Sequence, residues 1–313
     1  SRSILYGNMV HNVSGIDAIL SDGTNAHFGH VPGNLGDISG PKSYLDLIST
    51  VRDIATRERD EINLRYPDLL RNVGGYNLNT VDPAGHNLAQ LLVGSEGTLA
   101  YFQKIRLNLQ PIPVHRVLGI CLFSTLRSAM KIVPSMVRLE PSAVELVDRT
   151  MIDLANENPL FQPTIERFLT GNPAAVLLVE FSGDESNPLL DKLTQLRELV
   201  GELDPPIEII EALDPAFQAD IWEVRKSGLN ILMAMKGDGK PVSFIEDCTV
   251  PLEHLAQYTD RLSEEFDRHG VQGTWYAHAS VGTLHVRPIL NMKDPTHTII
   301  MREIAETACA VVR

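Results

Sequence analysis

The sequence predicts an α+β protein of two domains, the second being an antiparallel sheet covered by helices on one face. Strand-like and helix-like segments succeed one another without a strict βαβ repeat, which favours an antiparallel sheet. Two prolines close a strand at Leu107–Pro113, and the pattern changes beyond them. The 313 residues, 43% of them hydrophobic, suffice for one large or two ordinary cores. We therefore divide the chain into residues 1–112 and 113–313.

In the first domain, short apolar runs separated by glycines indicate strands joined by tight turns, and an Asp-Gly pair ends a hairpin at Gly23. A stretch rich in Gly, Pro, Asn and His indicates a loop. Apolar residues that recur at helical spacing then indicate an amphipathic surface helix. The predicted segments are strands and turns over 1–23, the loop over 24–40, the helix over 41–66 and a strand over 99–107.

In the second domain, apolar runs of strand length alternate with amphipathic segments. Pro141 stands at the first turn of one predicted helix, a position that proline favours. The predicted strands are 117–123, 135–139, 174–181, 207–210, 242–251 and 275–288, and the predicted helices are 124–133, 141–155, 188–201, 252–269 and 296–312.

Two glycine-bearing turns lie a short helical span apart between Arg71 and Leu99. Glycine adopts positive φ and lets a ligand approach the backbone closely, so two such turns near each other suggest a flavin or nucleotide site. Taken alone, each could equally be an ordinary turn that leads into a strand. The residues of the two turns are Gly74, Gly75, Tyr76 and Asn77 in the first, and Gly94, Ser95, Glu96, Gly97 and Thr98 in the second.

Two histidines, His278 and His285, flank Gly282. A turn at Gly282 between two strands would bring both imidazoles to the same end of a hairpin, where they could share a divalent ion. Two unrelated histidines in a β-turn-β unit are the more common case. Arg225 lies in the segment IWEVRKSG and offers a planar fork that fits a carboxylate, although an arginine on an amphipathic helix is usually solvated.

The order and spacing of the glycine turns resemble the FAD-binding domain of the p-cresol-methylhydroxylase (PCMH) and vanillyl-alcohol-oxidase superfamily. The motif LVGSEGTL, residues 92–99, most resembles the FAD-linked dehydrogenases of D-2-hydroxy acids. The resemblance implies that residues 1–112 are the second half of a PCMH-type FAD-binding domain and that the turn residues above bind FAD. It also implies that residues 113–313 are the C-terminal cap domain of an FAD-linked oxidase.

This resemblance implies oxidation of a D-2-hydroxy acid, of the D-2-hydroxyglutarate or D-lactate type, to the 2-oxo acid with hydride transfer to FAD. His278 and His285 would then bind zinc or another divalent metal, or act as a base, and Arg225 would grip the substrate carboxylate. The family's third metal ligand lies a further helix downstream in a Glu-His-Gly motif, and no such motif appears before Arg313, so the metal site is incomplete if the chain as given is all there is. Positive charge on Lys226 and Arg287 favours 2-hydroxyglutarate or a similar acid.

The segment FIEDCTVP, residues 244–251, resembles the family's strand before the next helix. Some relatives carry a lysine there that reaches the substrate, but Ile245 stands at the matching position, so this contact is not carried over. We expect Glu246 and Asp247 to cap and position the following helix.

The chain reads as an internal fragment, because it begins at Ser1 on strand-like sequence and the family's pyrophosphate-binding glycine loop would lie upstream. We expect it to hold FAD poorly and to be inactive alone. The histidine loop YAHASVG, residues 276–282, looks most like large members fused to an iron–sulfur domain. Since three cysteines cannot hold a cluster that needs four, such a domain, or a quinone or electron-transfer protein as acceptor, would lie outside this chain.

Composition excludes several other functions. The net charge of −13 argues against nucleic-acid binding, and no apolar run has the length of a membrane span. The odd cysteine number predicts a reducing, cytoplasmic compartment. Two alternatives stay open: a cofactor-free cap or structural module of a larger flavin and iron–sulfur assembly, and a metal hydrolase built on the histidine pair, which lacks the usual helical His-Glu-x-x-His motif.

Overall fold

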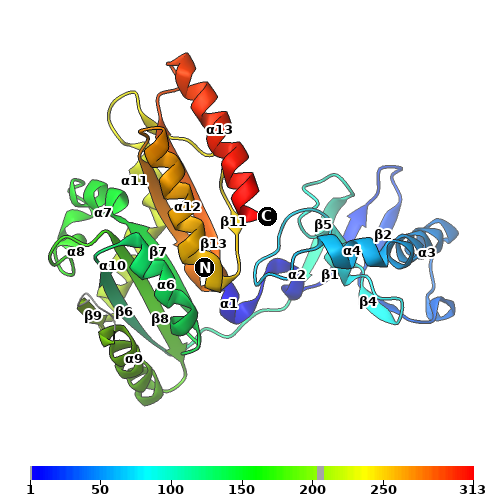
Figure 1. Ribbon diagram of the computed structural model, residues 1–313. Helices are drawn as coiled ribbons and strands as arrows, with labels where there is room; N and C mark the ends of the chain where they lie inside the picture. The colour runs from blue at the N-terminus through cyan, green and yellow to red at the C-terminus, as the bar shows by residue number, and fades with distance from the viewer. Residues whose placement is uncertain (1, 203–207) are drawn as a thin grey trace. The chain divides into compact units, whose positions relative to one another are not determined.

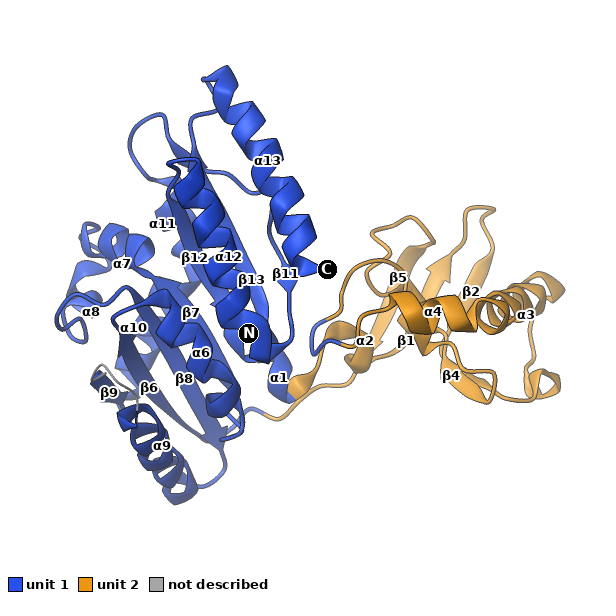
Figure 2. Cartoon of the chain, in the orientation of Figure 1, with its two compact units in different colours: residues 1–5, 69–71, 112–313 blue, residues 6–68, 72–111 orange. Residues whose placement is uncertain are grey.

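The computed structural model describes residues 2–202 and 208–313, and the chain forms two compact units (Figure 2). The small unit comprises residues 6–68 and 72–111. The large unit comprises residues 112–313 with two short segments, 1–5 and 69–71. We describe each unit by itself.

The small unit contains a three-stranded antiparallel sheet with the order β2-β1-β5, and β1 and β2 form the predicted hairpin around Gly23. Ile16 and Phe28 of this sheet form one core with Ile48 and Leu88. From the N-terminus through β5, the elements are α1 (Ser3–Tyr6), α2 (Met9–Asn12), β1 (Val13–Ile19), β2 (Asn25–Phe28), β3 (His30–Pro32), η1 (Leu35–Asp37), α3 (Lys42–Arg57), α4 (Arg59–Arg65), η2 (Leu78–Thr80), β4 (Gly85–Asn87), α5 (Ala89–Leu92) and β5 (Tyr101–Leu107).

The amphipathic helix predicted over residues 41–66 is present as α3 and α4, which meet at Glu58. Its inner face buries Ile48 and also Arg52, whose guanidinium donates hydrogen bonds to the carbonyls of Pro32 and Gly33. A buried cation thereby satisfies backbone carbonyls at the end of β3. The helix pair is therefore fastened to the small unit by polar as well as apolar contacts.

The large unit is organised around one antiparallel sheet of eight strands with the order β10-β13-β12-β7-β8-β6-β9, to which β11 adds by pairing with β13 (Figure 1). Within the β12–β13 hairpin, β12 pairs with β7, which is remote in the sequence, and β13 pairs with the nearby strands β10 and β11. The strands are β6 (His115–Phe123), β7 (Ala143–Asp148), β8 (Ala175–Gly183), β9 (Glu208–Ala212), β10 (Lys240–Pro241), β11 (Cys248–Thr249), β12 (Gly273–His278) and β13 (Thr283–Leu290).

Helices cover both faces of this sheet (Figure 1). Successive residues of a strand point to opposite faces, so Leu146 and Ala277 pack with the helices α6, α9, α12 and α13, while Val147 and Tyr276 pack with α7, α8, α10 and α11. The helices and turns of the large unit are α6 (Leu126–Val137), α7 (Arg149–Asn156), α8 (Gln162–Ile165), α9 (Ser186–Gly201), α10 (Pro215–Lys226), α11 (Gly228–Met233), η3 (Leu252–His254), α12 (Leu255–Arg268), η4 (Ala279–Val281) and α13 (Pro295–Val312).

The predicted α+β class is confirmed, but covering of the sheet on one face only is wrong. Residues 141–155 are not one helix, because β7 and its buried β-branched residues occupy the first half and α7 begins only after Asp148. Residues 135–139 are not a strand, since α6 continues to Val137 with Pro134 inside it. Residues 242–251 form a strand only at β11.

In the small unit, two short helices precede β1, and the predicted loop over 24–40 contains β2, β3 and η1. The strand predicted over 207–210 is β9, and residue 207 lies outside the described residues. The remaining predicted helices and strands are present with shifted ends.

Asp148 joins three elements of the large unit. Its carboxylate accepts hydrogen bonds from the backbone N–H of Met151 at 3.0 Å, which caps α7, and from the backbone N–H of Trp275 at 2.8 Å in β12. The Thr274 hydroxyl donates a third, at 3.1 Å. Burial raises the pKa of Asp148 to about 6 despite these donors.

We predict that Asp148→Ala lowers the free energy of unfolding by about 3 kcal/mol, because the helix loses its cap and buried N–H donors lose their acceptor. Urea unfolding of the purified protein measures this. Asp294→Ala is the matched control, since Asp294 caps α13 in the same way at an accessible position and should cost clearly less. Equal losses in the two variants would contradict a joining role for Asp148.

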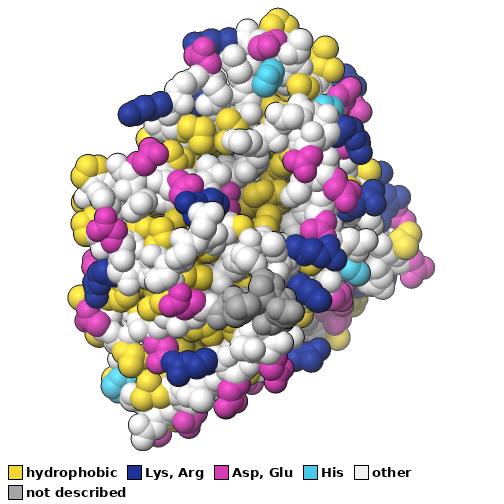
Figure 3. Space-filling view, turned by 60° about the vertical axis from the view of Figure 1, so that its left-hand side comes forward, with side chains coloured by type: hydrophobic (Ala, Val, Ile, Leu, Met, Phe, Trp, Pro, Cys, Tyr) yellow, Lys and Arg dark blue, Asp and Glu magenta, His cyan; other side chains and the backbone are white. Residues whose placement is uncertain are grey.

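Acidic and basic side chains lie interspersed on the face shown in Figure 3, so their charges partly cancel locally there. Among the described residues, no helix has both the length and the apolar character needed to cross a membrane.

Candidate functional site

The two glycine turns of the small unit lie against each other. The Tyr76 and Thr98 hydroxyls are 2.8 Å apart, and the Asn77 side-chain amide donates to the carbonyls of Gln90 and Val93, both at 2.9 Å. The turns therefore form one continuous backbone surface, although η2, β4 and α5 lie between them in the sequence.

This surface has the features that a flat polar ligand needs. Gly75 and Gly97 have φ values of +75° and +78°, and an added Cβ at either would meet no atom within 4 Å, so both have open faces. Glu96 also adopts a left-handed φ of +51°. The Ser95 hydroxyl is buried and has no hydrogen-bond partner in the described part of the chain. The residues of the two turns therefore fit a flavin, and the Ser95 hydroxyl is a polar group that could hydrogen-bond to it.

The histidine pair of the large unit lies on the β12–β13 hairpin, which turns at Gly282 with a φ of +74°. His285 pairs across the hairpin with Tyr276, two residues before His278 in β12, so both imidazoles project from one face of the sheet. Their ring centroids are 5.1 Å apart with the rings nearly perpendicular, and Tyr276 stacks on His285 at 4.6 Å. The turn therefore brings the two rings together.

A buried carboxylate connects His278 to Arg225. The two oxygens of Glu145 lie 2.9 and 3.0 Å from His278 Nδ1, and Oε2 lies 2.7 Å from Arg225 Nη2. The Glu145 side chain is only 1% exposed and that of Arg225 only 10%. Burial acts to raise the pKa of Glu145, but the hydrogen bond from His278 and the charge of Arg225 outweigh it and lower the pKa overall. Arg225 is therefore not a solvated surface charge.

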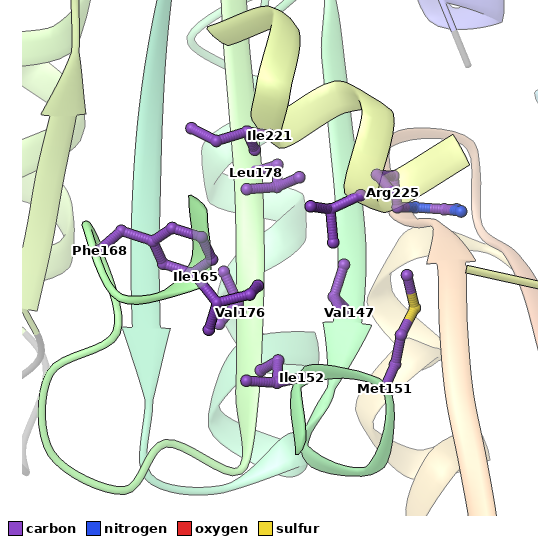
Figure 4. A pocket seen from close by; sticks show the side chains of 10 residues that line it. Val147, Met151, Ile152, Ile165, Phe168, Val176, Leu178, Ile221 and Arg225 are labelled. Atoms are coloured by element: carbon purple, nitrogen blue, oxygen red, sulfur yellow. The ribbon is translucent and has the colours of Figure 1, made fainter. Parts of the chain in front are cut away.

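The aliphatic stem of Arg225 rests on an apolar layer, whereas its guanidinium points away from that layer (Figure 4). The layer encloses a cavity of about 20 Å³ with wholly apolar walls, including Val147, Ile221 and Leu178. The guanidinium also lies 5.1 Å from the centre of the Tyr276 ring, a cation–π contact. Packing on two sides thus fixes the direction in which Arg225 presents its fork.

Beyond the guanidinium lies an open cavity of about 550 Å³. The Nε of Arg225 and the indole N–H of Trp222 are buried donors that have no hydrogen-bond partner in the described part of the chain. Such donors are expected to find an acceptor, and a carboxylate would supply one. The cavity is lined among others by Arg116, Glu145, Trp222, Arg225, Lys226 and His278.

The expectation that Glu246 and Asp247 cap the next helix is wrong. The pairing of β11 with β13 places these residues beside the hairpin, and the N-cap of η3 is Pro251, with no side-chain cap hydrogen bond. Asp247 adopts a left-handed φ of +58° and its carboxylate lies 3.1 Å from His285 Nδ1, while Glu246 forms an ion pair with Arg287. The charge of Arg287 is therefore neutralised within the protein.

His285 is held in its neutral form. Burial, assisted by the positive charge of the neighbouring His278, lowers the pKa of His285 to about 4. The nearby carboxylates of Asp247 and Glu246 act in the opposite direction but do not outweigh burial.

The histidine pair fits part of a metal site. Both Nδ1 atoms face carboxylates, the outer-shell arrangement typical of histidines that bind metal through their other ring nitrogen. Among the described residues, however, no group of three or more His, Cys, Asp or Glu side chains could hold a metal ion. Catalytic zinc usually has three protein ligands, so this chain supplies at most two of them.

Sequence reasoning missed Glu145, Asp247 and Tyr276. The signal for Glu145 was present, because a carboxylate inside the apolar run AVELV implies a buried charge that needs a partner. Because this run lies within the helix predicted over residues 141–155, Glu145 was not recognised as a buried charge. Asp247 carried no local signal, since its contact depends on the pairing of β11 with β13.

Most of the chain matches a known family. Residues 112–312 match the family of FAD linked oxidases, C-terminal domain, and the chain belongs to this family. The predicted family is therefore confirmed.

Three relatives illustrate the similarity. The chain is 31% identical to D-2-hydroxyglutarate dehydrogenase of Escherichia coli over 326 residues, which covers 99% of this chain and 32% of that protein. A similar match is found with the Pantoea ananatis D-2-hydroxyglutarate dehydrogenase, 31% identical over 99% of this chain and 32% of the relative. The mitochondrial D-lactate dehydrogenase [cytochrome] of Arabidopsis thaliana is 32% identical over 64% of this chain and 34% of its own length. The chain thus spans about a third of these relatives' lengths.

Solved structures share the fold. The 4-ethylphenol oxidase from Gulosibacter chungangensis superposes with a TM-score of 0.59 at 12% identity over 97% of this chain and 57% of its own. p-Cresol methylhydroxylase gives a TM-score of 0.56 at 11% identity over 96% of this chain and 55% of its own. At these identities the match supports the PCMH-type fold alone.

We predict that His285 makes the protein less stable as the pH falls from about 6.5 to about 4. In this window the unfolded chain takes up a proton at His285 that the folded chain does not, so acidification favours unfolding. In His285→Gln, the free energy of unfolding in urea should therefore change less between about pH 7 and about pH 5 than in the wild type. An identical change in both proteins would show that His285 is not held neutral.

Proposed function

We propose that the protein of which this chain is part is an FAD-dependent dehydrogenase that oxidises a D-2-hydroxy acid to the 2-oxo acid. The observation that carries the proposal is the buried group of Arg225, Glu145 and His278 beside His285, in a member of the FAD-linked oxidases. The names of the bacterial and plant relatives support this class of substrate.

Arg225 binds the substrate carboxylate in this proposal. Only one of its N–H donors is used by Glu145, and Arg225 lines a cavity large enough for a small acid. Packing of its stem and the bond to Glu145 hold the fork in place before the substrate arrives. Pre-positioned binding of this kind orients the α-carbon for reaction.

His278 is the better base of the pair. Its Nδ1 donates to the Glu145 carboxylate, which stabilises the imidazolium that forms when Nε2 takes the proton of the substrate hydroxyl. His285, whose pKa is lowered to about 4, stays neutral and lies beside His278 as a second nitrogen ligand or hydrogen-bond partner. The two histidines thus have different environments and different roles.

FAD, when bound, accepts the α-hydrogen and electron pair of the substrate. The residues that would hold it are the two glycine turns, Gly74–Asn77 and Gly94–Thr98, with residues 1–112 as the second half of the flavin domain. A zinc-like ion could be held by His278 and His285 with a ligand from elsewhere, and we assign no step to it. The same proposal includes an electron acceptor outside this chain, which is an iron–sulfur domain, a quinone or an electron-transfer protein. It also includes a cytoplasmic location.

A dicarboxylic acid such as D-2-hydroxyglutarate suits the cavity better than D-lactate. Arg116 adds positive charge beside Arg225 at its wall, and Glu145, which also lines it, is neutralised by its partners. The charge argument made from the sequence gains no support from Lys226 or Arg287, because Glu223 pairs with Lys226 and Glu246 pairs with Arg287.

A panel of D-2-hydroxy acids tested on the full-length protein with an artificial dye acceptor tests this function. We expect dye reduction with D-2-hydroxyglutarate and weaker reduction with D-lactate, and none with the L-isomers. Absence of reduction with every acid, in protein that contains its flavin, would exclude the proposed reaction.

In the full-length protein, His285→Ala should lower turnover by orders of magnitude and leave the flavin content nearly unchanged, because the ring belongs to the reacting site and not to the glycine turns. Visible absorbance gives the flavin content and dye reduction gives the turnover. His115→Ala, which removes an exposed histidine at the start of β6, is the control. Equal turnover in the wild type and His285→Ala would remove His285 from the mechanism.

Gly97→Ala should lower the flavin content of the full-length protein, since a methyl group would stand on the open face of the second turn. Gly23→Ala is a matched control, because Gly23 also has a positive φ, +84°, and no atom within 4 Å of an added Cβ. Both substitutions carry a similar backbone strain of about 1 kcal/mol. If both variants retain the same flavin, the turn does not bind it.

A further inference from the structure

The central strand β7 carries one charged side chain between apolar neighbours, Glu145. In the pairing with β12, Val147 lies opposite Tyr276 and Leu146 opposite Ala277, so continuation of the register brings Glu145 beside His278. The same face of β7 is covered by α10, which carries Arg225. Sheet pairing and helix packing therefore converge on this carboxylate.

Glu145 constrains His278 and Arg225. An ionised carboxylate has only acceptors, so His278 must present a protonated Nδ1 to it, and the ring's Nε2 is then directed away without a proton in the neutral form. The bond from Arg225 Nη2 at 2.7 Å fixes the rotation of the guanidinium and leaves Nε and Nη1 for a second acceptor. One side chain thus sets the orientation of two proposed functional groups from different elements.

We infer that Glu145 is a positioning residue of the substrate site: it holds the His278 ring in one tautomer and the Arg225 fork in one orientation, so that base and carboxylate binder are aligned with each other. This inference rests on the proposed function for its effect on catalysis. Its structural part, the single tautomer and orientation, concerns this chain alone.

Glu145→Gln in the full-length protein tests the inference with a side chain of nearly the same shape. We expect kcat/KM for D-2-hydroxyglutarate to fall about 10–100-fold, the usual range for residues that orient a reacting side chain. The loss should divide between a raised KM, through Arg225, and a lowered kcat, through His278. Glu145→Asp keeps the charge but withdraws it by one methylene, so a similar loss there separates position from charge.

Glu265→Gln is the matched control. Glu265 is a buried glutamate of α12 that pairs with His269 at 3.0 Å, and it does not line the substrate cavity. Losing that contact tests for a general effect of removing a buried charge. If Glu265→Gln reduces kcat/KM as much as Glu145→Gln, the loss is a stability effect and the inference fails.

A second readout needs no substrate. The ¹⁵N chemical shifts of the His278 ring, recorded over a pH series after chelation of metals, report its tautomer. We expect one tautomer with a protonated Nδ1 in the wild type and a mixture in Glu145→Gln. A wild type that already shows a mixture, or a variant with the same spectrum and kinetics as the wild type, would overturn the role of Glu145.

The two proposals can fail separately. If the full-length wild type oxidises no hydroxy acid while the histidine spectrum responds to Glu145→Gln as expected, the function is wrong and the orienting contact stands. If the enzyme is active and Glu145→Gln changes neither the spectrum nor kcat/KM, the function stands and the inference is wrong.

Discussion

The large sheet has no free face over its central strands, and this constraint determines the candidate site. Every residue of β7 is buried, so its one glutamate can be accommodated only with partners that satisfy both oxygens. Alternation along the paired strands sends the apolar residues of β12 and β13 toward α12, and sends Tyr276, His278 and His285 toward α10. The polar cluster is therefore a product of strand register as much as of residue type.

Much of the fold could be predicted from the sequence where the local pattern agreed with the final environment. The hairpin around Gly282 and the helix α13 are examples, because turn chemistry and hydrophobic period determine them locally. Residues 141–155 failed because a strand buried on both faces has no alternation, and its continuous apolar run followed by an amphipathic helix imitates one long helix. Burial of the sheet on both faces was missed for the same reason.

In the candidate site, too, contacts that depend on local sequence could be predicted and contacts between remote segments could not. The proximity of His278 and His285 follows from a local turn and could be predicted. Arg225 was singled out by its chemistry, but its burial depends on the packing of α10 on a distant strand. The contacts of Asp247 and Glu246 required knowledge of which strand β11 joins, and nothing in the segment itself indicates that. Pairing partners remote in the sequence are what single-sequence reasoning cannot supply.

That remoteness also bears on how the molecule forms. Glu145 and His278 are separated by 133 residues, and the strand pair that unites them can assemble only after the chain between them has been synthesised. Closing so long a loop before its contacts are gained slows folding. During synthesis, β8 can pair with one edge of β7 early, but the edge that pairs with β12 must wait until nearly the last stretch of this chain emerges. Such exposed strand edges are where misassembly begins, and a holding chaperone would act on them at this stage.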